Sequence, residues 1–277
     1  MTDIFKESDI EVLVATMNRD NLDFLFDMFP SINYTSLNLL VVNQTTEEKK
    51  IHSEYNNIRV INVFEKGLSK SRNKALRNAK GKLCIITDDD VIFKPDFQHK
   101  IVKAFNDNSN AVIISFRVED ENGKLYKEYP DYTKDNTSIF DRLNIMSVEM
   151  VLNRTVFDSF NIEFNENFGL GATFEMGEEA IFINEVYTKG GKVILEPETL
   201  LSHSSADTNK KIVVEDKYYI QGALFSALFR GNFLLWVYIK ILFDIKQKKI
   251  TIKQIPVLLK RAKAGRKKYL QLDENNG

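Results

Sequence analysis

The stretch Leu83-Cys84-Ile85-Ile86-Thr87-Asp88-Asp89-Asp90 joins a short apolar run directly to three acidic residues. The apolar part predicts a strand that is buried on both faces, as in a parallel sheet. In an open α/β sheet, ligands bind at the edge formed by the carboxyl ends of the strands. Three carboxylates at that edge repel one another, so we expect a cation beside them.

Asp88 and Asp90 are two residues apart, so their side chains can project to the same side and share one divalent ion. Mg²⁺ and Mn²⁺ bind one or two carboxylates and complete their shells with phosphate oxygens. The sequence therefore predicts a Mg²⁺ or Mn²⁺ cofactor. An acidic turn that caps the helix near Pro95 is the alternative. A calcium-binding EF-hand loop is excluded, because Phe93 and His99 stand where that loop needs Gly and Glu.

Apolar runs on both sides of this stretch alternate with helical patterns. Strands are expected at 10–16, 37–42, 58–63, 83–87, 111–118, 147–152 and 192–195, and helices at 20–30, 45–55, 67–81 and 178–189. This alternation predicts βαβ units, and hence an α/β fold with a Rossmann-type, mostly parallel sheet flanked by helices. Residues 119–140 are polar with turn signals and predict a hairpin and loop insertion.

The chain changes character after Asp207, where helices are expected at 215–230, 233–246 and 251–270. The net charge is −1, yet residues 211–277 hold fourteen Lys/Arg against five Asp/Glu. We therefore expect a body at 1–210 and a basic amphipathic helical extension at 211–277. The extension fits an anionic membrane surface. The alternative is a helical unit packed on the body with a solvated basic face.

Polar residues follow the first predicted strand at Thr16, Asn18 and Arg19. Short polar side chains there can bind a base or ribose, and an arginine can reach a phosphate. A loop with a helix cap explains them equally well. The chain lacks an overall basic charge, so no nucleic-acid partner is expected. The single Cys84 and the polar N-terminus predict a cytoplasmic location.

Five motifs occur in order along the chain: strand–TMNR, strand–VVNQTT, GLSKSRNKAL, strand–TDDD and FNENFGLGATFEMGEEAIFINEVYTKGGKV. This ordered set resembles the family 2 glycosyltransferases of the GT-A fold over about residues 10–205. The family pattern runs roughly TYNR, VVDDGS, GLSxARN, LDxDD, FDExF and GEDxxLxxRLxxxG. The resemblance implies an inverting enzyme of bacterial polysaccharide or glycan synthesis. Such an enzyme moves a sugar from a nucleoside diphosphate, here UDP, to a hydroxyl of a glycan or lipid-linked acceptor.

Carried over position by position, the resemblance implies a nucleotide-sugar site at Thr16, Asn18, Arg19, Asn43, Gln44, Arg72, Asp88 and Asp89. It implies metal ligands at Asp88, Asp90 and His203. Glu179 falls at the Asp of the GED motif, which is the general base, and Glu178 is its alternative. Both acids are also favoured at a helix start by the helix dipole, and a lone histidine such as His203 can be structural. The acidic pair that the family has after its second strand is Asn43–Gln44 here.

The resemblance further divides the GT-A-like catalytic domain into a nucleotide-binding half at about 1–110 and an acceptor-binding half at about 111–210. Two other functions remain open. A sugar-phosphate nucleotidyltransferase usually has a Gly-rich loop after its first strand, which TMNRDN lacks. A non-catalytic nucleotide-sugar or carbohydrate-binding protein would not need the acid pair at 178–179. The expected location is the cytoplasm, with peripheral attachment at the inner face of the cell membrane.

Overall fold

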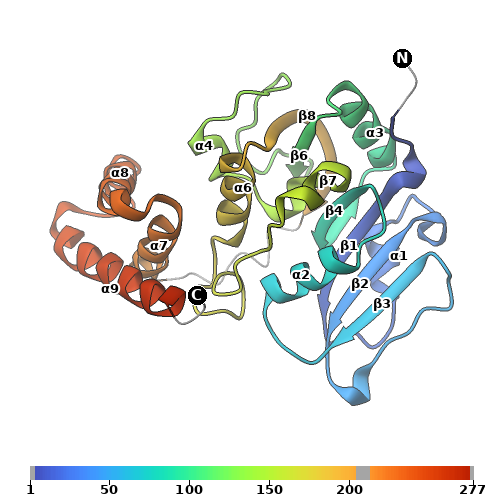
Figure 1. Ribbon diagram of the computed structural model, residues 1–277, viewed down its shortest axis with the longest axis horizontal. Coiled ribbons are helices and arrows are strands. Elements are labelled where there is room, and N and C mark those ends of the chain that lie inside the picture. Colours follow the sequence, from blue (N-terminus) through green and yellow to red (C-terminus); the bar gives the residue numbers. More distant parts are fainter. Residues whose placement is uncertain (1–3, 204–212, 275–277) are drawn as a thin grey trace.

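The computed structural model describes residues 4–203 and 213–274. The expected boundary between body and extension, at 210 and 211, lies outside these ranges. Figure 1 shows the sheet of the body toward one end of the molecule and the helices of the extension at the other.

Within the described ranges, one mixed sheet has the strand order β3-β2-β1-β4-β7-β6-β8-β5. The strands are β1 (Ile10–Met17), β2 (Leu39–Gln44), β3 (Ile58–Val63), β4 (Leu83–Asp88), β5 (Val91–Phe93), β6 (Ala111–Glu119), β7 (Met150–Asn153) and β8 (Lys192–His203). Strands β1 to β4 are mutually parallel, and β6 and β8 run in the same direction. β7 and β5 run opposite to the others. The predicted α/β class and its largely parallel sheet are confirmed, and the carboxyl ends of β1, β2 and β4 meet at one edge.

Helices of the body cover both faces of this sheet. They are α1 (Phe24–Met28), α2 (Leu68–Asn78), α3 (Phe97–Asp107), α4 (Ile139–Arg142), α5 (Arg154–Phe157) and α6 (Glu178–Thr188). The extension consists of α7 (Val214–Phe229), α8 (Phe233–Lys246) and α9 (Ile255–Glu274), which pack against one another in a separate cluster. Alternate residues of β1 enter two separate cores, because successive side chains of a strand point to opposite faces. Val12 and Val14 pack on the side of α1 and α3, and Leu13 packs on the side of α2 and α6.

Three of the sequence-based boundaries are wrong. The helix expected at 45–55 is a single 3₁₀ turn at Glu47–Lys49, since the segment is largely exposed and has no apolar face to bury. The strand expected at 147–152 starts at Met150, after a 3₁₀ turn at Ser147–Glu149. The strand expected to end at Leu195 continues to His203, with irregular register along its pairing with β6.

The predicted helical extension is confirmed, and it is tightly packed. α7 and α8 form an antiparallel hairpin, in which the rings of Phe229 and Trp236 stack with centroids 4.1 Å apart. α9 crosses α7 so closely that a Cβ on Gly222 would lie 2.0 Å from the Ala262 carbonyl oxygen. The close approach therefore requires glycine at this crossing. A cluster of Phe168, Phe174, Ile181, Ile220, Ala223 and Tyr269 joins the extension to the body.

In the described part of the chain, Val214–Lys246 is long and apolar enough to cross a membrane by length and composition alone. This stretch is divided at Arg230–Asn232, where the chain reverses between α7 and α8. The Tyr218 hydroxyl donates to the buried Asp244 carboxylate over 2.9 Å, which ties the start of α7 to the end of α8. The stretch is therefore a helical hairpin and not one straight span.

Candidate active site

The turn after β4 holds Asp89 and Asp90 beside two different partners. The Thr16 hydroxyl and Arg19 Nε both donate to Asp89 Oδ2, the second over 2.7 Å. His203 Nε2 lies 3.2 Å from Asp90 Oδ1, and this contact lowers the pKa of Asp90. His203 reaches the turn because β8 pairs with β5, the strand that follows the acidic residues. The cations expected beside the acidic residues are thus supplied in part by the chain itself.

Arg72 on α2 is the centre of a buried ion cluster and is 2% exposed. Its Nη1 donates to Glu178 Oε1 over 3.0 Å and to Glu179 Oε1 over 3.3 Å. Its Nη2 donates to Asp88 Oδ1 over 3.3 Å and to Ser147 Oγ over 2.7 Å. Burial alone lowers the pKa of Arg72, but the three carboxylates outweigh it and raise the pKa overall. The guanidinium is therefore a fixed positive charge that bridges three elements.

The acids around Arg72 differ in accessibility and in proton affinity. Burial and the neighbouring Glu179 raise the pKa of Glu178 to about 8, although Arg72 acts in the opposite direction. Burial also raises the pKa of Asp88, despite its bond to Arg72. The Glu178 side chain is 5% exposed and that of Glu179 is 21% exposed. Glu178 is thus the member of the pair that holds a proton more readily, and Glu179 is the member that is more exposed.

Side chains of α2 also hold the loop that leads into α6. Asn73 Nδ2 donates to the Phe164 carbonyl over 2.9 Å, and Asn73 Oδ1 accepts from the Phe164 amide over 2.7 Å. The Ser69 hydroxyl donates to the Phe168 carbonyl over 2.6 Å. Gly169 has φ +101°, and a Cβ there would lie 2.9 Å from Ser69 Oγ. The GLSKSRN segment therefore positions the start of α6, where Glu178 and Glu179 lie.

Stability should depend on pH through Glu178. Its folded-state pKa is about 8, against an ordinary value of 4.5. Between these two pH values the folded chain keeps a proton that the unfolded chain releases. The free energy of unfolding therefore decreases as the pH rises from 4.5 to about 8. We expect Glu178→Gln to raise the melting temperature of the metal-free protein near pH 8, and the gain to shrink toward about pH 5. Thermal melts across pH in EDTA measure this, and a gain independent of pH would show that Glu178 is ionised throughout.

The other predicted binding residues lie at the same edge of the sheet. Asn18 is exposed after β1 and has φ +53°. Asn43 is buried, accepts from the Arg19 amide over 3.4 Å and donates to Asn62 Oδ1 over 3.1 Å. Gln44 is buried and donates to the Gly67 carbonyl over 2.6 Å. The amides after β2 thus brace the loop after β1 and the start of α2.

The model of the family described as Glycosyl transferase family 2 matches residues 11–159, which is more than half of the chain. The chain belongs to this family. It is a glycosyltransferase, and its family membership supports a nucleotide sugar as the donor. This outcome favours the transferase over the nucleotidyltransferase and the non-catalytic binder. The comparison with curated proteins found no match.

Solved structures of S. aureus TarS share the fold of this family 2 chain. TarS 1–349 aligns with a TM-score of 0.54 at 18% identity, over 79% of this chain and 64% of that one. Its complex with UDP-GlcNAc aligns with a TM-score of 0.54 at 18% identity, over 79% and 66%. Its complex with UDP gives 0.52 at 18%, over 79% and 64%. This chain thus spans less than two thirds of the length of these TarS structures.

Enzymes of family 2 typically use a divalent metal ion. In residues 4–203 and 213–274, no group of three His, Cys, Asp or Glu side chains is arranged to hold a metal ion. Asp90 and His203 nevertheless place a carboxylate oxygen beside an imidazole nitrogen. Such a pair suits Mg²⁺ or Mn²⁺ when substrate phosphates supply the remaining ligands. Asp88, the other predicted ligand, has its carboxylate turned toward Arg72.

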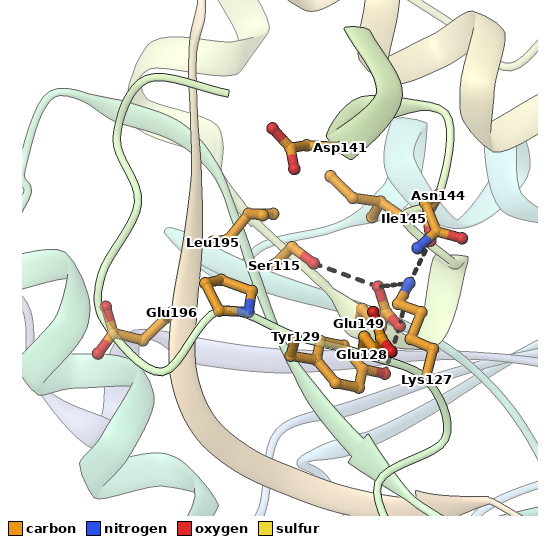
Figure 2. A pocket seen from close by; sticks show the side chains of 11 residues that line it. Ser115, Lys127, Glu128, Tyr129, Asp141, Asn144, Ile145, Glu149, Leu195 and Glu196 are labelled. Carbon is orange, nitrogen blue, oxygen red and sulfur yellow. Dashed lines mark hydrogen bonds and ion pairs between the residues drawn. The ribbon is translucent and has the colours of Figure 1, made fainter. Parts of the chain in front are cut away.

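Another buried acid, Glu149, lies in the same 3₁₀ turn as Ser147, next to the Arg72 cluster. Glu149 lines a cavity of about 50 Å³. Figure 2 shows Lys127 and Tyr129 against its carboxylate. Lys127 Nζ lies 2.7 Å from Glu149 Oε1, and the Tyr129 hydroxyl donates to the same oxygen over 2.7 Å. These bonds fix the loop at 120–138 to the 3₁₀ turn that also carries Ser147, the partner of Arg72. No sequence motif predicts this cluster, because Glu149 is a lone acid in an apolar run.

Proposed function

We propose that this glycosyltransferase moves a sugar from UDP to an acceptor hydroxyl with inversion at the anomeric carbon. The observation that carries the proposal is the partly exposed Glu179, held by the buried Arg72 at the sheet edge that also carries the acidic turn. The complex of TarS with UDP-GlcNAc supports UDP as the nucleotide.

In this proposal, the donor lies across the carboxyl ends of β1 and β4. Arg19 is 41% exposed in its side chain and would pair with a phosphate. Thr16, Asn18 and Asp89 would contact the ribose and base. Asn43, Gln44 and Arg72 would act on the nucleotide sugar indirectly, through the loops and carboxylates that they hold.

Asp90 and His203 would hold a Mn²⁺ or Mg²⁺ ion. When bound, that ion would offset the negative charge that develops on the diphosphate leaving group. Asp88 would keep its bond to Arg72 and face the sugar, with a role in metal binding only if the carboxylate turns away from Arg72.

Glu179 would take the proton of the acceptor hydroxyl as that oxygen attacks the anomeric carbon. Attack from the side opposite the departing UDP inverts the configuration. A base must be ionised to accept a proton. The high proton affinity of Glu178 favours this, because a protonated Glu178 places no second negative charge beside Glu179. The bond from Arg72 would hold the Glu179 carboxylate in position for the acceptor hydroxyl.

The acceptor would be a hydroxyl of a glycan or of a lipid-linked saccharide. The enzyme would then act in the cytoplasm, at the inner face of the cell membrane, where it can meet both a nucleotide sugar and a lipid-linked acceptor.

The proposal is tested with a panel of nucleotide sugars in thermal-shift and UDP-release assays, with and without Mn²⁺. A UDP-sugar is expected to raise the melting temperature more when Mn²⁺ is present. Asp90→Asn should raise the Mn²⁺ concentration at half-maximal activity by about tenfold or more, because a metal ligand loses its charge. Asp96→Asn, at an exposed acid paired with Lys100, is the control and should leave it unchanged. Activity that is indifferent to EDTA would overturn the metal assignment.

A further inference from the structure

Helix α8 is apolar on both its buried and its exposed face. Phe233, Val237 and Ile241 are buried against the rest of the extension. On the opposite side, the side chains of Leu235 and Leu242 are 59% and 66% exposed. Further exposed apolar residues of this helix are Leu234, Tyr238 and Phe243. A helix that is hydrophobic all round is normally buried on all sides. Within residues 4–203 and 213–274, no segment covers the outer face of α8, so this face is available to a partner outside those residues.

The exposed face continues into an apolar groove between the extension and the body. The groove is lined chiefly by Phe140, Leu143, Trp236, Ile239 and Phe243, with a cavity volume of about 280 Å³. Phe140 belongs to α4, its ring lies 5.7 Å from that of Trp236, and it is 53% exposed. The apolar surface thus runs from α8 to the half of the body that holds Ser147 and α6.

The charges around this face are almost all positive. From Arg230 to Lys268 the chain has twelve Lys and Arg residues and one acid, Asp244. Asp244 is buried and bonded to Tyr218 and Lys240, so it offers no negative charge at the surface. Lys246, Lys248 and Lys249 are exposed at the end of α8, and none forms an ion pair within the part of the chain that the structure describes.

We propose that α8 lies in the plane of an anionic lipid bilayer, with Leu235, Tyr238, Leu242 and Phe243 in the interface and the lysines at the headgroup phosphates. Apolar side chains flanked by Lys and Arg are what binds a peripheral helix to such a surface. A second copy of the chain is less favourable at this face, because the Lys and Arg residues around the face would repel those of the other copy. One straight span over Val214–Lys246 is excluded by the hairpin that α8 forms with α7, and α8 alone has 14 residues, fewer than the ~20 that cross a bilayer.

In Figure 1, α8 lies at the end of the molecule away from β1–β3, while α4 and α6 lie between them. A bilayer at α8 would therefore contact the molecule on the side of the acceptor half and leave the nucleotide edge facing water. This orientation suits an acceptor that is carried on a lipid, and this consequence rests on the proposed function. The proposed contact between α8 and the lipid does not rest on the proposed function.

The test is flotation of the full chain with vesicles of phosphatidylcholine, alone or mixed with phosphatidylglycerol. The parent chain should float with the mixed vesicles at low salt, and high salt should weaken binding. Leu235→Ser with Leu242→Ser should weaken it about tenfold or more. Lys246→Gln, Lys248→Gln and Lys249→Gln together should remove the preference for phosphatidylglycerol. The matched control is Ile4→Ser with Phe26→Ser, two exposed apolar side chains on the body, which should float like the parent.

Three readouts keep the outcomes separate. Circular dichroism must show that each variant is folded, and the donor-induced thermal shift must match the parent, so that loss of flotation is not loss of structure. Failure of the parent to float, or flotation of the serine variant at parental levels, would overturn the proposal. A parental dimer by light scattering that becomes monomeric in the serine variant would assign the face to a second copy. Failure of every nucleotide sugar to bind, with flotation intact, would instead sink the proposed function alone.

Discussion

Glu179→Gln is expected to lower kcat for sugar transfer by about 10²- to 10⁴-fold, the range that a positioned general base contributes. The amide has nearly the shape of the carboxylate but cannot take the proton of the acceptor hydroxyl. The Glu179 side chain bonds to Arg72 and lies against Glu178, and an amide oxygen can keep the bond to Arg72, so the fold and the donor KM should change little. Initial rates of UDP release with saturating acceptor, together with a donor titration, measure both quantities.

The companion variant Glu178→Gln decides which acid is the base. Burial and the neighbouring Glu179 raise the pKa of Glu178, so a neutral amide at 178 should behave like the parent side chain in this assay far more closely than Glu179→Gln does. If Glu178→Gln abolished transfer while Glu179→Gln retained near-parental turnover, the base would be Glu178 and the assignment given above would be wrong.

Arg72→Met is expected to reduce the free energy of unfolding by about 3–5 kcal/mol, because it leaves buried carboxylates without their cation. The deficit should be larger near pH 8 than near pH 5. Loss of Arg72 raises the pKa values of Asp88 and Glu178 further, and a group with a raised folded-state pKa loses stability as pH rises. Urea unfolding at both pH values measures the effect. Arg72→Lys should recover only part of it, since an ammonium group cannot bridge Asp88, Ser147 and both glutamates.

Arg77 provides a control on the same helix. It pairs with Glu163 at the surface, and the two side chains are 52% and 48% exposed. Exposed pairs contribute roughly 0–1 kcal/mol, so Arg77→Met should have a small effect at both pH values. An equal loss in the two variants would mean that the charge removed from α2, and not the buried cluster, is responsible.

The first four strands could be predicted from the sequence because each has a clear local pattern. Strands β1, β2 and β4 are almost fully buried, so each appears as a largely apolar run that ends in polar residues. β3 lies at the edge of the sheet and is mostly half-buried, so its apolar and polar residues alternate instead. β5 has three residues and follows the acidic turn directly, which leaves too short a pattern to detect. β8 continues through Pro197 and alternates burial irregularly beyond Leu195, so only its first half looks like a strand.

The composition of the site could be predicted, but its pairings could not. Thr16, Arg19, Asp89 and Asp90 stand at strand ends, where a ligand edge is expected. The resemblance suggested that Arg72 would meet the base or the diphosphate, whereas the structure turns it toward Asp88, Glu178 and Glu179. That bridge joins residues as far as 107 positions apart, and no local pattern encodes such a contact.

Helix α2 has one more consequence. Its side chains at Ser69, Arg72 and Asn73 bind the loop at 164–168, the turn at Ser147 and the start of α6, so this helix is bonded at several points to the part of the body that follows residue 146. A hinge motion between these two parts of the body would have to break these buried contacts together. The donor site should therefore be preformed, and no domain closure should be needed in each turnover.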